Sequence, residues 1–476
     1  MRRTLKKIIY SVVFGLMMVH GSAQATSKTQ PKVDSLDPIN RSYLEAFCAY
    51  HPASSLCFFT PNPPVRPNPN PGGPGEPIPV PGPGGPGIPP TPFAGCGTQA
   101  NLCYPSTGRS VPVSGASQLQ AALNSARAGD HIILAGGTYA GTFQYSKDGQ
   151  PSNPIVIQGN GTAVFTGQFN MRGSYGVLTR VRFQGGTMTM NGHHNRVSRV
   201  SFTGSRGTTI AMEGGPHMCN RIDHNEFKSF TGWAIEINAT RDASKHQGHR
   251  IDHNYFYDHH VGSSEEVVRM LTDAYRDSYL TYDYNLFDRV LQGVRHQSEA
   301  ISIKTARTIL LGNTITNSGN ASFVFRETNR SLAQNNYMDG GAKMEVMGDD
   351  NVIKGNTATG GGSIRIRGGD GTMDITRPGC PKSGLVPVLP NCKGIHSAAR
   401  NTVVSDNIGP ISIGDLYAGN TYKAENTTGS NNSGPIRLLA GQTGTNVTTG
   451  NPTPQARKLT PADVGFSVGD ASCSGN

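Results

Sequence analysis

The stretch from Gln297 to Arg326 carries three ionisable residues, Glu299, Lys304 and Arg326, among β-branched and small residues that favour strands. Lysine can act as a general base, arginine can neutralise or stabilise a developing negative charge, and a carboxylate can bind a metal ion. The stretch is therefore either a catalytic site or a solvated charged face. The scaffold around it decides between the two.

One reaction uses these residue types together. Cleavage of a uronate-containing polymer by β-elimination requires that the carboxylate be neutralised, that a base remove the proton on the neighbouring carbon, and that the leaving oxygen be protonated. Lysine suits the second task and arginine the first or third. An extended polymer can lie along a groove formed by successive coils of a solenoid, each coil supplying one row of side chains.

A repeated segment, seen as RIDHNEF from Arg221 and as RIDHNYF from Arg250, predicts such a solenoid. Its shared asparagines are separated by 29, 31, 28, 23 and 20 residues, which approaches one coil each. They are Asn225, Asn254, Asn285, Asn313, Asn336 and Asn356. Asparagine tolerates left-handed φ at a sharp turn, and its amide can bond its equivalents in the coils above and below. The apolar residue two positions later should point inward.

The predicted fold class is all-β, a right-handed parallel β-helix with a short N-terminal capping helix. A content of 60 Gly, 32 Pro and 16% charged residues in 476 fits a turn-rich β protein. The helix should begin near a possible cap at Ser117, bury Leu119, Ala122 and Leu123, and protect the first coil from edge pairing.

Residues 1–25 resemble a cleavable signal peptide, with four basic residues, an apolar run and a cleavage site after Ala25. The mature chain is expected to be secreted or periplasmic. Its formal charge falls from +10 to +6, which suits an acidic polysaccharide or plain solubility. No later segment is apolar enough for membrane insertion, and no nucleic-acid partner is expected. The oligomeric state is left open.

The rest of the chain divides into three parts. Residues 26–60 form a short segment whose role the sequence does not reveal. Residues 61–93 are a Pro/Gly-rich linker, and residues 94–476 are the β-helix with irregular C-terminal coils. The segment from Leu459 to Asn476 is expected to be a terminal cap.

Eight cysteines permit many pairings, and export makes disulfides plausible. Proximity suggests the pairs Cys48/Cys57, Cys96/Cys103 and Cys380/Cys392, which leaves Cys219 and Cys473 over.

The stretch from Glu299 through Lys304 to Gly312-Asn-Thr and Arg326, with Glu266-Val-Val-Arg269 one coil earlier, resembles polysaccharide lyase family 6, which includes alginate lyases and chondroitinase B. The resemblance covers roughly residues 117–367. It implies that Lys304 is the base, that Arg326 is the acid and that Glu299 is an acidic calcium ligand.

Two departures from the family pattern concern calcium. Gln297 stands where the family usually has a second Glu, and Ser263 or Ser264 stands in place of an Asn. Calcium prefers several anionic oxygens, so both dependence on Ca²⁺ and independence of it stay open. Arg269 or Arg295 could screen the substrate carboxylate instead.

Glu299 and Lys304 are five residues apart, so strict strand alternation would put them on opposite faces. Glu299 is therefore expected to lie in or before a turn.

Further substrate-binding candidates follow from position. Lys343 falls where relatives often place a substrate-contacting arginine, Arg365 shares a strand face with Arg367, and His296 lies beside the site in sequence.

The predicted function is an exported polysaccharide lyase acting on a uronate polymer, with alginate as the favoured substrate. Chondroitin or dermatan sulfate is the main alternative substrate, and a noncatalytic polysaccharide-binding β-helix is the alternative function. A hydrolase would need paired carboxylates at the scissile bond, and the only adjacent Asp pair is Asp349-Asp350.

Overall fold

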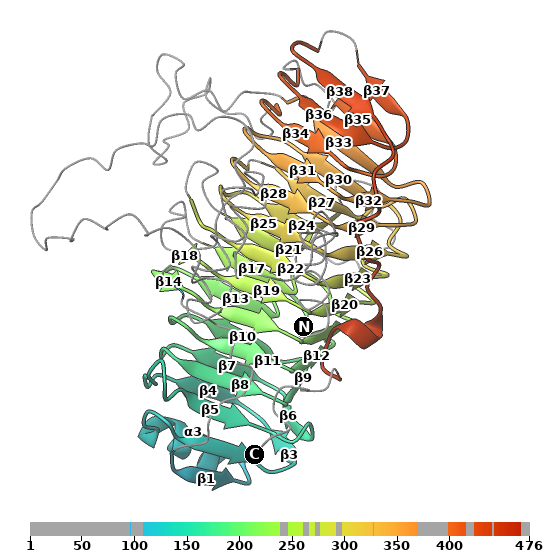
Figure 1. The fold of residues 1–476 in the computed structure, drawn as a ribbon. Coiled ribbons are helices and arrows are strands. Elements are labelled where there is room, and N and C mark those ends of the chain that lie inside the picture. Colours follow the sequence, from blue (N-terminus) through green and yellow to red (C-terminus); the bar gives the residue numbers. More distant parts are fainter. Residues whose placement is uncertain are drawn as a thin grey trace, which may run out of the picture. The chain divides into compact units, whose positions relative to one another are not determined.

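The described part of the chain is a stack of parallel β-coils (Figure 1). In the computed structural model, the residues described are Cys96, 108–238, 246–259, 266–271, 277–291, 298–326, 328–369, 398–415, 423–439 and 442–467. The predicted signal peptide, the segment 26–60, the linker and the pairs Cys48/Cys57 and Cys380/Cys392 lie outside these residues.

Three long sheets run along the stack, and all their strand pairs are parallel. Sheet A consists of β1 (Ser110–Val113), β2 (His131–Leu134), β5 (Ile155–Gln158), β8 (Gly176–Thr179), β11 (Arg196–Ser198), β15 (Arg221–Asp223), β19 (Arg250–Asp252), β22 (Thr281–Asp283), β25 (Ile309–Leu311), β28 (Leu332–Gln334), β31 (Val352–Lys354), β34 (Val403–Ser405), β36 (Thr428–Asn432) and β38 (Asn446–Thr449).

Sheets B and C complete each coil. Sheet B consists of β3 (Gly137–Tyr139), β6 (Ala163–Phe165), β9 (Arg182–Gln184), β12 (Ser201–Thr203), β16 (Glu226–Lys228), β20 (Tyr255–Tyr257), β23 (Leu286–Asp288), β26 (Thr314–Thr316), β29 (Tyr337–Met338) and β32 (Thr357–Ala358). Sheet C consists of β4 (Thr142–Tyr145), β7 (Gln168–Met171), β10 (Thr187–Met190), β13 (Ile210–Glu213), β17 (Ile235–Asn238), β21 (Glu266–Leu271), β24 (Glu299–Ile303), β27 (Ser322–Phe325), β30 (Lys343–Val346), β33 (Ser363–Arg367), β35 (Ile411–Asp415) and β37 (Ile436–Leu438). A small extra sheet pairs β14 (His217–Met218) with β18 (His246–Gln247). The predicted parallel β-helix is confirmed.

The helix α3 (Ala116–Ser125) packs on the first coils and buries Leu119, Ala122 and Leu123, as predicted. Ser117 lies inside the helix, so its predicted role as a cap is wrong. Gly115 takes the cap position, and the Gln118 side chain accepts hydrogen bonds from Ser114 N and Oγ instead. The structure describes no helix with the length and apolar character that a membrane span requires.

The asparagine ladder is confirmed, and it extends to Asn407 and Asn432. Within it, each side-chain amide donates to the Oδ1 of the ladder Asn in the next coil at 2.9–3.1 Å. The same Oδ1 also accepts the backbone N–H of the donating Asn, as Asn285 Oδ1 does from Asn254. The left-handed conformation belongs to the residue before each Asn, for example His253 and Tyr284. The prediction that the Asn itself has left-handed φ is therefore wrong, because its side chain turns inward to bond the neighbouring coils.

The residue two positions after each ladder Asn points into the core, as predicted. Phe227, Phe256 and Phe287 stack on one another with ring centroids 4.7–4.8 Å apart, and they are fully buried. Stacking at this distance adds to the burial of the rings themselves.

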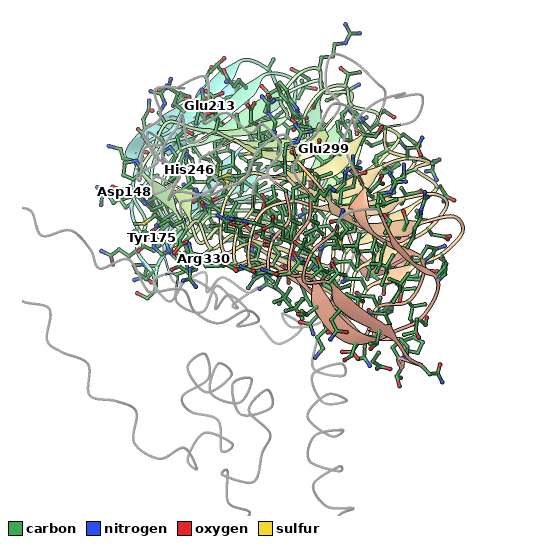
Figure 2. All side chains as sticks on the ribbon, turned by 90° about the horizontal axis from the view of Figure 1, so that it is seen from above. Asp148, Tyr175, Glu213, His246, Glu299 and Arg330 are labelled. Atoms are coloured by element: carbon green, nitrogen blue, oxygen red, sulfur yellow. A yellow bond between two sulfur atoms is a disulfide. The ribbon has the colours of Figure 1, made fainter. Side chains whose placement is uncertain are left out.

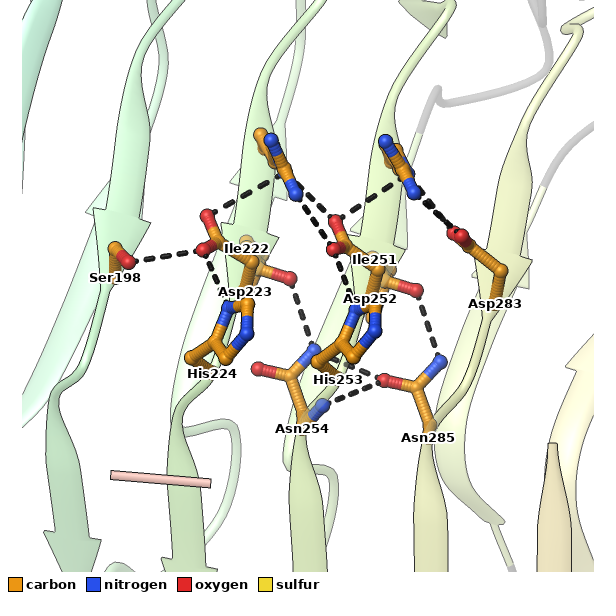
Figure 3. A network of polar contacts seen from close by, with 12 residues as sticks. Ser198, Ile222, Asp223, His224, Ile251, Asp252, His253, Asn254, Asp283 and Asn285 are labelled. Atoms are coloured by element: carbon orange, nitrogen blue, oxygen red, sulfur yellow. Dashed lines mark hydrogen bonds and ion pairs between the residues drawn. The ribbon is translucent and has the colours of Figure 1, made fainter. Parts of the chain in front are cut away.

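A second ladder, of arginine and aspartate, runs along the outer side of sheet A (Figure 3). Arg196 pairs with Asp223, Arg221 with Asp252 and Arg250 with Asp283, each across one coil at 2.5–2.9 Å. Burial opposes ionisation of Asp252, but the two neighbouring guanidinium groups outweigh it and hold its pKa well below the usual range. Arg221, Asp223, Arg250 and Asp252 are the Arg and Asp of the two RIDHN segments.

Among the described residues, a disulfide joins Cys96 to Cys219, with Cα atoms 5.2 Å apart. The predicted pair Cys96/Cys103 is therefore wrong. The partner is 123 residues away in sequence, and Cys219 lies between β14 and β15.

Residues 451–467 run back along the outside of the stack, so the part of the predicted cap that is described is a strap (Figure 1). Leu459 and Val464 pack on Leu286, and Gly465 N donates to His253 O. The short 3₁₀ helix η5 (Pro461–Asp463) lies within the strap.

We expect Asn285→Ala to lower the free energy of unfolding by about 1–3 kcal/mol, because it leaves Asn254 N and the surrounding buried polar groups without their partner. Chemical denaturation measures the effect. Asn446→Ala is the control, because Asn446 is exposed on β38, and its effect should stay within about 0.5 kcal/mol. Equal effects of the two substitutions would contradict this role of the ladder.

Candidate active site

Lys304 and Arg326 follow two neighbouring strands of sheet C. Ile303 of β24 pairs with Phe325 of β27, and both are buried in the core. Arg326 N donates to Ile303 O at 3.0 Å, which continues the pairing past the strand ends. The next residues, Lys304 and Arg326, therefore lie beside each other on the outer face of sheet C.

Glu299 is the first residue of β24, so the expectation that it lies in or before a turn is wrong. The register between β24 and β27 shifts between Glu299 and Ile301. Such a β-bulge adds one residue to one strand and changes the direction in which the flanking side chains point. The Glu299 carboxylate accepts a hydrogen bond from Arg326 Nη2. Figure 2 shows Glu299 on the same side of the β-helix as Glu213 of sheet C.

Lys304 is held by a carboxylate that the sequence prediction did not place in the site. Lys304 Nζ donates to Glu266 Oε1 at 2.8 Å, and Glu266 Oε2 lies 3.3 Å from Arg269 Nη1. Arg269 Nη2 in turn donates to Glu236 Oε1 at 2.6 Å. One signal could have found these partners: Glu236 and Arg269 are 33 residues apart, and the same interval separates Glu266 from Glu299.

The two carboxylates nearest the cations differ in their ionisation. Burial opposes ionisation of Glu266, but Lys304 and then Arg269 outweigh it and lower its pKa below the ordinary value. Burial raises the pKa of Glu299 to about 7, and the Arg326 charge offsets only part of that effect. Glu299 Oε2 is buried and has no hydrogen-bond partner among the described residues.

Arg269, predicted to bind substrate, is enclosed by the protein's own groups. Its Cζ lies 3.2 Å from the centroid of the Trp233 ring, and its edges meet Glu236 and Glu266. Trp233 and Glu236 belong to the preceding coil, and sequence reasoning missed both.

Lys343 and Arg365 lie on the coils beyond Arg326, on the same sheet. Lys343 Nζ donates to Asn320 Oδ1 at 3.1 Å, and burial lowers the pKa of Lys343. Arg365 Nη1 lies 3.4 Å from Asp415 Oδ2. The structure thus places both residues along the surface that continues from Lys304 and Arg326. Arg295 and His296 lie outside the described residues.

Glu299 is the residue that the resemblance assigns to calcium, and its surroundings can be compared with that role. The described residues include no group of three or more His, Cys, Asp or Glu side chains arranged to hold a metal ion. The two carboxylates beside Lys304 and Arg326 are each bound by a cation, Glu266 by Lys304 and Glu299 by Arg326. Gln297, Ser263 and Ser264 lie outside the residues described here.

Comparison with known proteins agrees with the resemblance drawn from the sequence. A family model described as Chondroitinase B matches residues 187–359, which include Lys304 and Arg326. No curated protein sequence matches the chain.

Solved structures of family 6 lyases share the fold. The polysaccharide lyase Pedsa3628 from Pseudopedobacter saltans has a TM-score of 0.61 at 17% identity, over 75% of this chain and 99% of its own. The alginate lyase AlyGC has a TM-score of 0.57 at 19% identity over 75% of this chain, which spans 55% of the length of AlyGC. A mannuronic acid specific family 6 lyase from human gut microbiota has a TM-score of 0.55 at 17% identity, over 70% of this chain and 83% of its own. The predicted resemblance to polysaccharide lyase family 6 is confirmed by the family match and the shared fold.

We predict that Glu299→Gln changes the pH dependence of stability. The folded state raises the pKa of Glu299 to about 7, so it favours the protonated form. The resulting stability is fully present below the ordinary pKa of a glutamate and is lost as the pH rises through about 7. The free energy of unfolding of Glu299→Gln minus that of the wild type should therefore become more positive as the pH rises from 5 to 8. Denaturation at several pH values in chelator-treated buffer measures this, and a difference that does not vary with pH would contradict it.

Proposed function

We propose that this chain is a polysaccharide lyase that cleaves a uronate-containing polysaccharide by β-elimination, with Lys304 as the base and Arg326 as the acid. The observation that carries the proposal is the pairing of β24 with β27, which sets Lys304 beside Arg326. Each cation has its own carboxylate partner, so each is held in place before substrate arrives. Fixed orientation of this kind accounts for much of the rate enhancement in enzymes.

In this proposal the Lys304 amine removes the proton from the carbon next to the uronate carboxylate. The electron pair of that C–H bond forms the new carbon–carbon double bond, and the glycosidic C–O bond breaks. Arg326, as the acid, stabilises the leaving oxygen with positive charge and donates a proton to it; Arg326 regains a proton from water, and Lys304 releases to water the proton that it took. The product carries an unsaturated uronate at its new end.

We further propose that the reaction does not depend on Ca²⁺. Two observations support this: the described residues hold no group of three or more His, Cys, Asp or Glu side chains that could bind a metal ion, and Gln297 replaces a charged ligand of the family pattern. A protein cation then screens the substrate carboxylate. Arg269 suits this task poorly, because two carboxylates already neutralise it. Arg295, four residues before Glu299 in sequence, is the remaining candidate.

Alginate is the proposed substrate, because AlyGC, whose fold this chain shares, is named as an alginate lyase. Chondroitin or dermatan sulfate is the second candidate, favoured by the description of the matching family model. Both polymers are acidic and contain uronates, so one assay can compare them.

We predict that the wild type produces ultraviolet-absorbing unsaturated uronate from alginate, and that Lys304→Ala and Arg326→Ala each lower kcat by about 10²–10⁴-fold. Lys354→Ala is the control, because Lys354 lies on β31 of sheet A, with Asp406 3.8 Å away. Chondroitin and dermatan sulfates are tested in parallel. New reducing ends without the absorbance would indicate hydrolysis, and binding without either product would indicate a noncatalytic protein.

We predict that treatment with a chelator, followed by its removal, leaves lyase activity within about twofold of the untreated enzyme. The physical reason is that the described carboxylates already have cationic partners, so no resident metal is needed to neutralise them. Activity is measured again after Ca²⁺ is added back. Loss of activity on chelation and recovery with Ca²⁺ would contradict the proposal.

A further inference from the structure

An unbroken series of side chains links Trp233 to Lys304. The Trp233 ring covers one face of the Arg269 guanidinium, at 3.2 Å from ring centroid to Cζ. Arg269 then contacts Glu266 Oε2 at 3.3 Å, and Glu266 Oε1 accepts the hydrogen bond from Lys304 Nζ at 2.8 Å. Glu266 therefore uses one oxygen for each cation.

Glu236 fixes the far edge of Arg269. Its Oε1 accepts hydrogen bonds from Arg269 Nη2 at 2.6 Å and from Nε at 3.2 Å, and its Oε2 accepts one from Thr208 Oγ1 at 2.9 Å. Only 16% of the Arg269 side chain is exposed. A substrate carboxylate would have to displace Glu236 or Glu266 to bind this guanidinium, so substrate binding is a poor use of it.

We propose that Arg269 is a positioning residue that acts on Lys304 through Glu266, and that Trp233 and Glu236 hold it there. This inference rests on the proposed function of Lys304 as the base. Without Arg269, the full negative charge of Glu266 would act on the Lys304 ammonium and make its proton harder to remove. The guanidinium offsets that charge while Glu266 still orients the amine.

The charged groups around Lys304 lie on the neighbouring strands of sheet C. They are Glu266 and Arg269 from β21, Glu299 from β24 and Arg326 after β27, and Glu236 from β17 adds to this set through its contact with Arg269. Two substitutions in this set change the charge near Lys304 in opposite directions. Arg269→Met removes a positive charge and keeps an apolar side chain over Trp233, whereas Glu236→Gln removes a negative charge and keeps an oxygen for Arg269.

The test is the pH profile of kcat/KM for unsaturated product formation from alginate. For Arg269→Met, the rising limb of the profile should move up by about one pH unit, so kcat/KM on that limb falls about tenfold while the high-pH plateau is retained. For Glu236→Gln, the limb should move down. Arg269→Lys keeps the charge, so its limb should stay near that of the wild type.

A matched control is Arg182→Met, because Arg182 also lies over an aromatic ring, Phe466, but on sheet B. Its profile should equal that of the wild type. Circular dichroism and the fluorescence of Trp233, the sole tryptophan of the chain, show whether each variant is folded. If Arg269→Met does not fold, two results still test the inference: the rising limb should move to lower pH in Glu236→Gln, and it should stay at the wild-type pH in Arg269→Lys.

Three outcomes would overturn the inference. One is that the rising limb of the pH profile lies at the wild-type pH in both Arg269→Met and Glu236→Gln. Another is that the limb moves in the same direction in both variants. The third is a higher KM with an unchanged limb in Arg269→Met, which would assign Arg269 to substrate binding. Absence of unsaturated product from the wild type itself would instead reject the proposed function.

Discussion

The in-register stacking of the coils is the constraint on which the rest of the structure depends. Buried asparagines fix it at the corner between sheets A and B, because each bonds both the backbone and the side chain of its equivalent in the next coil. An unmade hydrogen bond in this core is costly, so a one-residue slip between coils is strongly disfavoured. A residue at one position of a coil consequently lies beside the residue at the same position of the next. On the outer face of sheet C, the side chains at equivalent positions of successive coils therefore form rows.

The candidate site depends on this regularity and on one departure from it. Regular pairing after Ile303 and Phe325 sets Lys304 beside Arg326. The β-bulge between Glu299 and Ile301 lets the carboxylate of Glu299 join the same face. Without the bulge, alternation would direct Glu299 into the core, where an ionisable group has no place. A local loss of register therefore supplies the partner that holds Arg326.

What the sequence predicted correctly depends on short-range pattern. The asparagine spacing, the inward phenylalanines and the helix α3 each follow from residues close in the chain. The Cys96–Cys219 disulfide, the arginine–aspartate ladder and the partners of Arg269 join residues one or more coils apart, across loops of variable length. Because these loops differ in length, the intervals between partner residues are not constant, and the sequence alone does not show which residues are aligned. Only the register of the strands shows which charges meet, so the sequence did not reveal that Arg269 lies between Glu236 and Glu266.

Charge is distributed unevenly along the outer face of sheet C. Around the proposed base and acid, the described residues place three carboxylates, Glu236, Glu266 and Glu299, against three cations, Arg269, Lys304 and Arg326. These charges largely cancel, so this part of the face exerts little attraction on a polyanion. On the next coils Lys343, Arg365 and Arg367 exceed the nearby Glu345 and Asp415 by one positive charge. Attraction of an acidic polymer would then come from coils beside the chemistry, which leaves the charges around Lys304 free to set its protonation and orientation.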